Sequence, residues 1–391
     1  MKALPTIKYA WLQSGFWMSF CLIFNFSSMY LLSKGYSNTQ IGLIVAVAGL
    51  LSALLQPVVA GLSDSYPRIT LRRLILVLSV FIILCTAALL LPGLYFLLYA
   101  VFYGIILAVL QILTPLVNAI GMECINRGIS INYGLARGVG SVSYALISLV
   151  AGMIMERFPV GSAVPLLIIL CYVLVFAAAW FFCFQHAGTS YADEDSQESD
   201  ISGERASFFH AYRKFFVLLV GISLIFVCHN MINNYLYQIM TFHHGGSREM
   251  GIASCIAATC ELPTMIAFAW LIKKCTSGTL LKVSGVFFTI KALLTWLAVS
   301  AGGIYLAQSV QLLGFALYVP ASVYYTNNLI RKSDRAKGQA FMAATNTVGS
   351  VFGSLLGGRL LDILGVPSML LAATVISAVG MGLVFYASEK Y

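Results

Sequence analysis

The stretch "YGLARGVGSVSYALISLV", Tyr133 to Val150, places an arginine, Arg137, at the head of a run of small and apolar residues. Comparable apolar runs recur along the chain, and each is long enough for a helix that crosses about 30 Å of hydrocarbon. A charged side chain at the centre of such a helix costs about 2.5–3.5 kcal/mol. Arg137 therefore marks a candidate functional site.

The composition excludes a soluble globular protein. Of the 391 residues, 60% are hydrophobic and 9% are charged, whereas soluble domains carry about 25% charged residues. The apolar runs are continuous and do not alternate, which favours helices over a membrane β-barrel. The sequence therefore predicts an all-α polytopic membrane protein with twelve transmembrane helices, near residues 9–33, 39–62, 72–92, 94–120, 134–155, 162–184, 215–241, 250–272, 282–300, 303–329, 338–358 and 367–387.

The net charge of +9 is explained by topology. Positive side chains cluster in alternate predicted loops, which places both termini in the cytoplasm by the positive-inside rule. The first apolar run is too long for a signal peptide, so we expect a permanent span in the plasma (cytoplasmic) membrane. The basic excess then needs no nucleic-acid partner. The nine cysteines have no metal-like spacing, and we expect no metal and no cofactor.

One polar segment divides the chain. "QHAGTSYADEDSQESDISGERAS", residues 185–207, holds six of the fourteen acidic residues, as is typical of a solvated linker. The predicted organisation is an N-terminal six-helix half (1–184), a cytoplasmic acidic linker (185–214) and a C-terminal six-helix half (215–391). Val-Gly-Ser-Val occurs at 139–142 and again at 348–351. This repeat indicates either pseudo-symmetric halves or two independent small-residue helix contacts.

The segment "GLSDSYPRITLRR", residues 61–73, resembles the loop signature of the major facilitator superfamily. Gly61, Asp64, Arg72 and Arg73 correspond to that signature, while Pro67-Arg68 replaces its central glycine. In this interpretation the loop latches one conformation and does not bind substrate. The alternative is a turn aspartate beside charges that only set topology.

Three ionisable side chains fall within predicted spans: Arg137, Glu261 and Lys291. Such residues usually face a water-filled cavity and pair with one another. Arg137 lies near the start of its span, so snorkelling to the interface is an alternative. Glu261 lies deeper and precedes Pro263, which tends to bend a helix. For Glu261 and Lys291 the alternative is a purely structural charge pair.

Amide side chains accompany these charges in the spans. Amides both donate and accept hydrogen bonds, which matches the hydroxyl groups of a sugar. For any single amide, an interhelical hydrogen bond is the alternative. The candidates for substrate contact among them are Asn25, Asn118, Asn230, Asn233 and Gln311.

Four segments resemble one branch of the major facilitator superfamily, the lactose permeases or oligosaccharide:proton symporters. They are "FWM" at 16–18, "QPVVAGLSD" at 56–64, "GLARGVGSVSYAL" at 134–146 and "ELPT" at 261–264. The resemblance implies that Arg137 binds sugar, that Tyr144 stacks on the sugar ring and that Glu261 contacts sugar hydroxyls. Asn118 stands where that branch has a glutamate that pairs with the arginine.

The predicted tenth span departs from that branch. Gln311 replaces a histidine, Gly314 replaces the carboxylate that carries the coupled proton, and Lys291 replaces a nearby arginine. These departures weaken the case for proton coupling by that branch's route. The remaining candidate for proton uptake is Glu261, which either titrates during transport or holds substrate while transport is uncoupled.

The sequence thus predicts a secondary transporter for a sugar or glycoside, working by alternating access as a monomer. A nucleoside carrier and an efflux carrier for amphiphiles are alternatives within the same fold. A membrane-embedded enzyme would need a clustered catalytic set, and a channel would need a ring of lining charges or carbonyls. The sequence shows neither pattern.

Overall fold

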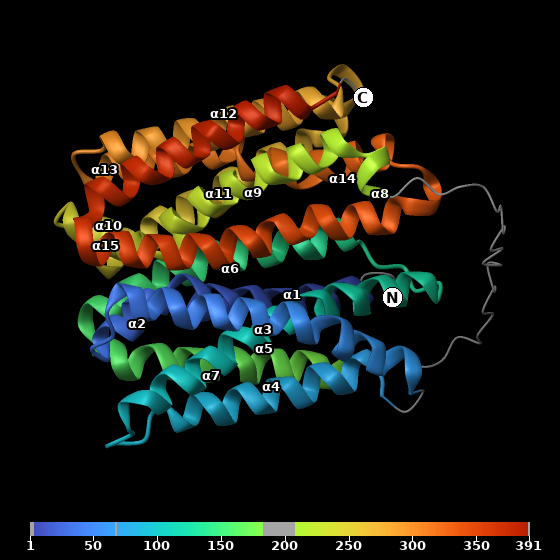
Figure 1. The fold of residues 1–391 in the computed structure, drawn as a ribbon. Coiled ribbons are helices and arrows are strands. Elements are labelled where there is room, and N and C mark those ends of the chain that lie inside the picture. Colours follow the sequence, from blue (N-terminus) through green and yellow to red (C-terminus); the bar gives the residue numbers. More distant parts are fainter. Residues whose placement is uncertain (1–3, 67–68, 183–207, 390–391) are drawn as a thin grey trace.

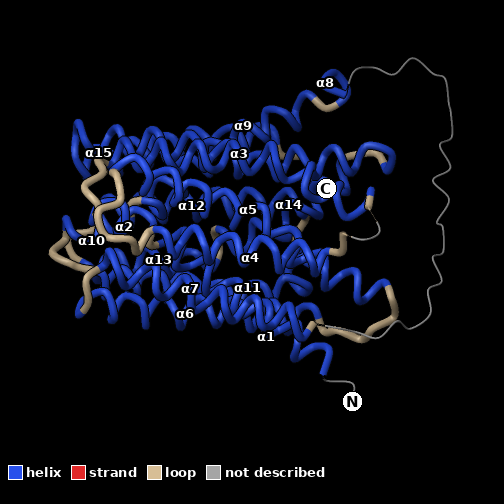
Figure 2. Tube along the Cα trace, turned by 90° about the horizontal axis from the view of Figure 1, so that it is seen from below, coloured by secondary structure: helices blue, strands red, loops and turns tan. Residues whose placement is uncertain are grey.

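The computed structural model describes residues 4–66, 69–182 and 208–389, and within these ranges the chain forms helices and no strand. The helices run side by side as a bundle, and the loops gather at its two ends (Figures 1 and 2). The first group of helices comprises α1 (Leu4–Phe20), η1 (Cys21–Asn25), α2 (Ser27–Ser33), α3 (Asn38–Ser65), α4 (Leu71–Ala88), α5 (Phe96–Asn126), α6 (Tyr133–Arg157) and α7 (Val160–Phe181).

The second group begins with α8 (Phe208–Ala211), which lies just before the first long helix of that group. The remaining elements are α9 (Arg213–Asn234), α10 (Leu236–Phe242), α11 (Ser247–Lys274), α12 (Ser277–Leu297), α13 (Ala301–Ser309), η2 (Val310–Leu312), α14 (Phe315–Leu329), η3 (Lys332–Asp334) and α15 (Arg335–Ala387). The two groups form the lower and upper parts of the bundle in Figure 1.

The number of crossings agrees with the predicted twelve. Ten described helices are long and apolar enough to span a membrane, and the bent pair of α1–η1 and α2 raises the number to eleven. A straight helix of the length of α15 would measure about 80 Å, but its backbone is non-helical at Gly365. Figure 1 shows two antiparallel segments on either side of this break. Counting them separately gives twelve spans.

The first spans of the two groups are both interrupted. The first span continues from α1 through the π-helical turn η1 and bends by 49° into the short α2. The seventh span ends α9 at Asn234 and continues as the short α10. Corresponding breaks in the first helix of each half are consistent with pseudo-symmetry.

The repeated Val-Gly-Ser-Val motif occupies equivalent contacts in the two halves. A Cβ atom at Gly140 of α6 would lie 2.7 Å from the Trp17 ring of α1. A Cβ atom at Gly349 of α15 would lie 2.3 Å from Cβ of Phe226 in α9. Each motif thus lets the fifth helix of its half approach the first helix closely. The repeat is therefore both a small-residue contact and a pseudo-symmetric feature.

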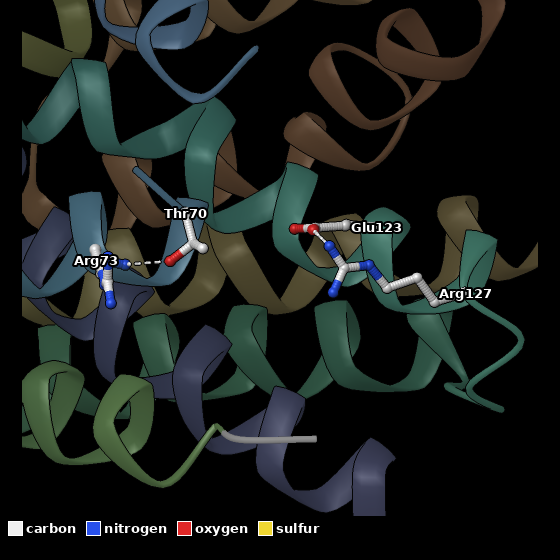
Figure 3. Close-up of polar contacts among 4 residues, drawn as sticks. All are labelled: Thr70, Arg73, Glu123 and Arg127. Atoms are coloured by element: carbon white, nitrogen blue, oxygen red, sulfur yellow. Dashed lines mark hydrogen bonds and ion pairs between the residues drawn. The ribbon is translucent and has the colours of Figure 1, made fainter. Parts of the chain in front are cut away.

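The loop with the superfamily signature connects α3 to α4. Thr70 caps α4 by accepting a hydrogen bond from the backbone nitrogen of Arg73, and Arg127 pairs with Glu123 at the end of α5 (Figure 3). Arg72 donates to the carbonyls of Ala179 and Trp180 at the end of α7. Arg72 thereby ties the start of α4 to the end of α7, both within the first half.

Some sequence predictions concern residues outside the described ranges. These include most of the predicted linker, 185–214, of which α8 and the first turn of α9 are described. Pro67 and Arg68 also lie outside the description. Gly61 and Asp64 lie in the last part of α3, and the side chain of Asp64 is outside the description.

Substitution of Gly349 tests the close packing within the second half. We expect Gly349→Val to lower the thermal stability of the purified protein because the new side chain would overlap the backbone of α9, and overpacking of this kind costs about 1–3 kcal/mol. Gly382→Val, beyond the Gly365 break, is the matched control, since a Cβ atom there meets nothing within 4 Å. Equal melting temperatures for the two variants would contradict the proposed contact.

Candidate functional site

The two halves meet through two pairs of helices, α3 with α15 and α6 with α11. Glycines bring both pairs into close approach. A Cβ atom at Gly42 of α3 would lie 2.2 Å from the Ser354 carbonyl oxygen of α15, and one at Gly251 of α11 would lie 2.4 Å from the Ser148 carbonyl oxygen of α6. Two turns further along α3, a Cβ atom at Gly49 would lie 3.7 Å from the nearest atom of Val351. The helices α3 and α15 are therefore closest near the start of α3.

A carboxylate joins the halves at this end of the bundle, where α3 begins and α15 breaks. Oδ1 of Asp362 accepts hydrogen bonds from the backbone nitrogen and Nδ2 of Asn38, at 3.1 and 2.9 Å. Its Oδ2 accepts from the backbone nitrogen and Oγ1 of Thr39, at 2.7 and 2.6 Å. Asp362 thus supplies acceptors to the first turn of α3, where a negative charge is favourable. We call this contact the Asp362 clasp.

Three polar side chains of the second half form a chain of hydrogen bonds. Nζ of Lys291 in α12 donates to Oε1 of Gln311 at 2.6 Å, and Nε2 of Gln311 donates to Oε1 of Glu261 in α11 at 2.9 Å. Lys291 is 3% exposed. The predicted Glu261–Lys291 pair is thus joined through the Gln311 amide.

Gln311 lies at a break in the tenth span. The backbone changes from α13 to the 3₁₀ turn η2 and resumes as α14 after Gly314. Thr264 donates to the carbonyl oxygen of Leu312, and Ser284 donates to that of Gly314. Because these hydroxyls satisfy two carbonyls of the break, irregular backbone is tolerated there inside the membrane.

Arg137 lies against an aromatic ring of the first half. Its guanidinium carbon is 3.8 Å from the centroid of the Trp17 ring, and Nη1 donates to Ser141 one turn further into α6. Trp17 is about 20 Å along the helix from the start of α1. The side chain of Arg137 therefore points into the bundle, which argues against snorkelling.

A chain of hydrogen bonds supports Trp17. Nε1 of Trp17 donates to Oε1 of Gln13, and Nε2 of Gln13 donates to Oδ1 of Asn118 in α5 and to the Tyr9 hydroxyl. Asn118 is thereby linked to Arg137 through Gln13 and Trp17. The indole face bears a cation, as is favourable for a cation–π contact.

Glu261 interacts electrostatically with side chains of both halves. Its charge interacts with Lys291 of its own half and with Arg137 of the other. It also interacts with Tyr144. The structure thus brings together four of the predicted site residues, Arg137, Tyr144, Glu261 and Gln311, with Lys291 behind Gln311.

Three other predicted amides are hydrogen-bonded within the protein. Asn25 donates to Ser254 and so bridges the halves, and Asn230 donates to the Phe226 carbonyl in its own helix, at the contact with α15. Asn233 contacts His229, whose ring stacks on Phe315. In this conformation these three amides have partners within the protein.

Sequence reasoning missed Gln13 and the Asp362 clasp. A glutamine within the first apolar run was the signal for Gln13. Asp362 lies in the predicted loop between the spans 338–358 and 367–387, where a single acid is ordinary, so nothing in the sequence distinguished it. Its partners, Asn38 and Thr39, are more than 300 residues away in the chain.

A family model identifies the fold. The MFS_1 like family model matches residues 15–384, nearly the whole chain. The chain belongs to the MFS_1 like family. It is thus a transporter of the major facilitator superfamily, as the loop signature predicted. The match does not distinguish branches, so membership of the lactose permease branch stays a prediction. No curated protein sequence shows a significant match to this MFS_1 like chain.

Solved structures agree on the fold. A mutant of the nucleoside transporter NupG superposes on this MFS_1 like chain with a TM-score of 0.77 and 13% identity, covering 99% of each chain. A bacterial homologue of the human lysosomal transporter Spinster, in an inward-facing conformation, superposes with a TM-score of 0.68 and 14% identity. The match covers 99% of this chain and 97% of that one. A POT family transporter with a bound peptide conjugate superposes with a TM-score of 0.70 and 15% identity. The match covers 98% of this chain and 94% of that one.

The Asp362 clasp predicts a conformational effect. We expect Asp362→Ala to lengthen the distance between spin labels at positions 37 and 363, because four hydrogen bonds to a charged acceptor are lost and each contributes about 1.5–3 kcal/mol. Electron paramagnetic resonance distance measurements would show the change. Asp334→Ala, which removes the ion-pair partner of Lys337, should leave the distance unchanged; a shift in both variants would count against the clasp.

The Gln311 bridge predicts a stability effect. We expect Gln311→Leu to lower the melting temperature by several degrees, since it leaves the buried ammonium of Lys291 without its hydrogen-bond acceptor. Gln311→Glu should recover only part of the stability, because the new carboxylate pairs with Lys291 but replaces the donor to Glu261 by a like charge. Gln308→Leu, one turn away on the same span, is the control for apolar substitution at a buried amide.

Proposed function

We propose that this protein is a secondary transporter that carries a sugar or glycoside by alternating access. Glu261 carries this proposal, because its charge interacts with Arg137 of the first half and with Lys291 of the second. A solute bound between Arg137 and Glu261 would contact both halves at once. Rocking of the halves about such a site is how transporters of this fold exchange access.

The side chains around Glu261 suit a hydroxylated solute. Arg137 offers planar donors, Glu261 and Gln311 offer acceptors, and Tyr144 offers a ring face for the apolar side of a sugar. Gln308 is 1% exposed, and neither of its amide atoms has a hydrogen-bond partner. A buried amide left unpaired costs about 1–3 kcal/mol. A polar solute or a second conformation that satisfies it would recover this cost.

The geometry supports an inward-facing state. The halves are held at the end of the bundle where α3 begins, by the Asp362 clasp and by the close approach at Gly42 and Gly251. The opposite end of the bundle carries both termini, and the positive-inside distribution supports a cytoplasmic location for it. The membrane in this proposal is the plasma membrane. We propose that this conformation is closed to the outside and that the protein acts as a monomer.

A nucleoside is the second candidate substrate. Two structures entitled nucleoside transporter NupG share the fold, and the Trp17 and Tyr144 rings offer faces on which a base could stack. Counterflow in proteoliposomes separates the candidates. A carrier shows saturable exchange of labelled solute, so we would compare monosaccharides, disaccharides and nucleosides under identical conditions. Flux that does not saturate would contradict a carrier.

Glu261 decides the question of proton coupling. If its carboxylate takes up the coupled proton, Glu261→Gln should keep counterflow and lose accumulation driven by a pH gradient. Uptake with and without the gradient, in wild type and variant, measures this. Accumulation by Glu261→Gln equal to that of the wild type would exclude Glu261 as the proton site. Glu249→Gln, at the start of the same helix, is the control.

A further inference from the structure

The charges deep in the spans do not balance. Of the fourteen acidic residues, Glu261 alone lies in the interior of a predicted span. The others lie outside the predicted spans, at positions 64, 123, 156, 193, 194, 195, 198, 200, 204, 249, 334, 362 and 389. The deep cations are Arg137 and Lys291. This group of three therefore carries two positive charges and one negative charge.

Both cations are held close to the single carboxylate. Lys291 is buried and reaches Glu261 through Gln311. Arg137, from the other half, is fixed by Trp17 and Ser141, and its charge interacts with Glu261. One carboxylate cannot neutralise both. With each side chain in its ordinary charge state at neutral pH, the three groups together carry a net charge of +1.

The surrounding amides do not supply the missing negative charge. The side chain of Asn118 accepts from Gln13, and that of Gln311 is shared between Lys291 and Glu261. An unbalanced charge inside a membrane protein is costly, because the low dielectric constant of the interior leaves an unpaired charge poorly stabilised. A solute that brings one negative charge removes that cost.

We propose that the transported solute is an anion, a hydroxylated molecule with a carboxylate or phosphate group that binds at Arg137. The structure gives one guanidinium donor of Arg137 a partner, Ser141. A planar guanidinium favours two-point hydrogen bonding to carboxylate or phosphate, while Glu261 and Tyr144 face the hydroxylated part. This inference rests on the proposed transport function and narrows its substrate class.

Matched solutes test the charge directly. Counterflow would be measured for glucose, glucuronate and glucose 6-phosphate, and for uridine and uridine monophosphate. We expect an anionic member to compete at least about tenfold better than its neutral parent, as a charge-assisted contact provides. The carboxylate and phosphate arms show which acid group is preferred. Neutral solutes that exchange better than their anionic partners would overturn the charge inference and leave the carrier function standing.

Variants of Lys291 test where the preference originates. Lys291→Gln removes the excess charge, so we expect the anionic and neutral solutes to compete within about twofold to threefold of each other. Lys291→Arg keeps the charge and should keep the preference. If Lys291→Gln does not fold, Asn118→Glu can be used instead. It adds a carboxylate to the hydrogen-bonded chain that supports Trp17, and we expect the same loss of preference for the anionic solute. An unchanged anion preference in a folded, charge-balanced variant would refute the assignment.

The two hypotheses fail in different ways. Saturable counterflow restricted to neutral sugars or nucleosides refutes the anion and keeps the carrier. Absence of saturable flux for every solute, with protein that is folded by circular dichroism and elutes as a single species, contradicts the carrier and the anion together.

Discussion

A charge inside a bilayer must find a partner, and the centre of this protein is arranged by that constraint. Lys291 is almost wholly buried and is hydrogen-bonded to Gln311, which also holds Glu261. Arg137 rests on an indole ring that is positioned by Gln13. Both arrangements spread charge over neutral polar groups, which costs less desolvation than burying a second acid would. They also hold Glu261 at the boundary between the halves, where movement of one half relative to the other changes its surroundings.

The fold could be predicted largely from the sequence because bilayer thickness sets the length of every apolar run. The twelve predicted spans follow from that constraint, and the described helices agree with them once the two segments of α15 are counted separately. The breaks at Phe26, Tyr235 and Gly314 could not be predicted in the same way. Neither proline nor a charge marks these positions. The break at Gly314 depends on hydroxyl donors from neighbouring helices, which Thr264 and Ser284 provide.

The site was predictable where its residues are chemically rare. Arg137, Glu261 and Lys291 stand out in apolar runs, and the structure brings them together. Amides are less informative, because an amide hydrogen-bonds equally well to a solute or to another helix. Asn25, Asn230 and Asn233 have protein partners in this conformation, whereas Gln311 joins two charges. Which use an amide serves depends on tertiary neighbours that one sequence does not display.

The Asp362 clasp has a mechanical consequence. Both oxygens of a single rigid carboxylate bind two adjacent residues at the tip of α3, so a small tilt of either helix strains every one of these bonds in the same instant. Such a joint does not loosen by degrees: it stays engaged or releases as a unit. The end of the bundle that carries the clasp should accordingly switch between two discrete positions, and partly open forms should be sparsely populated.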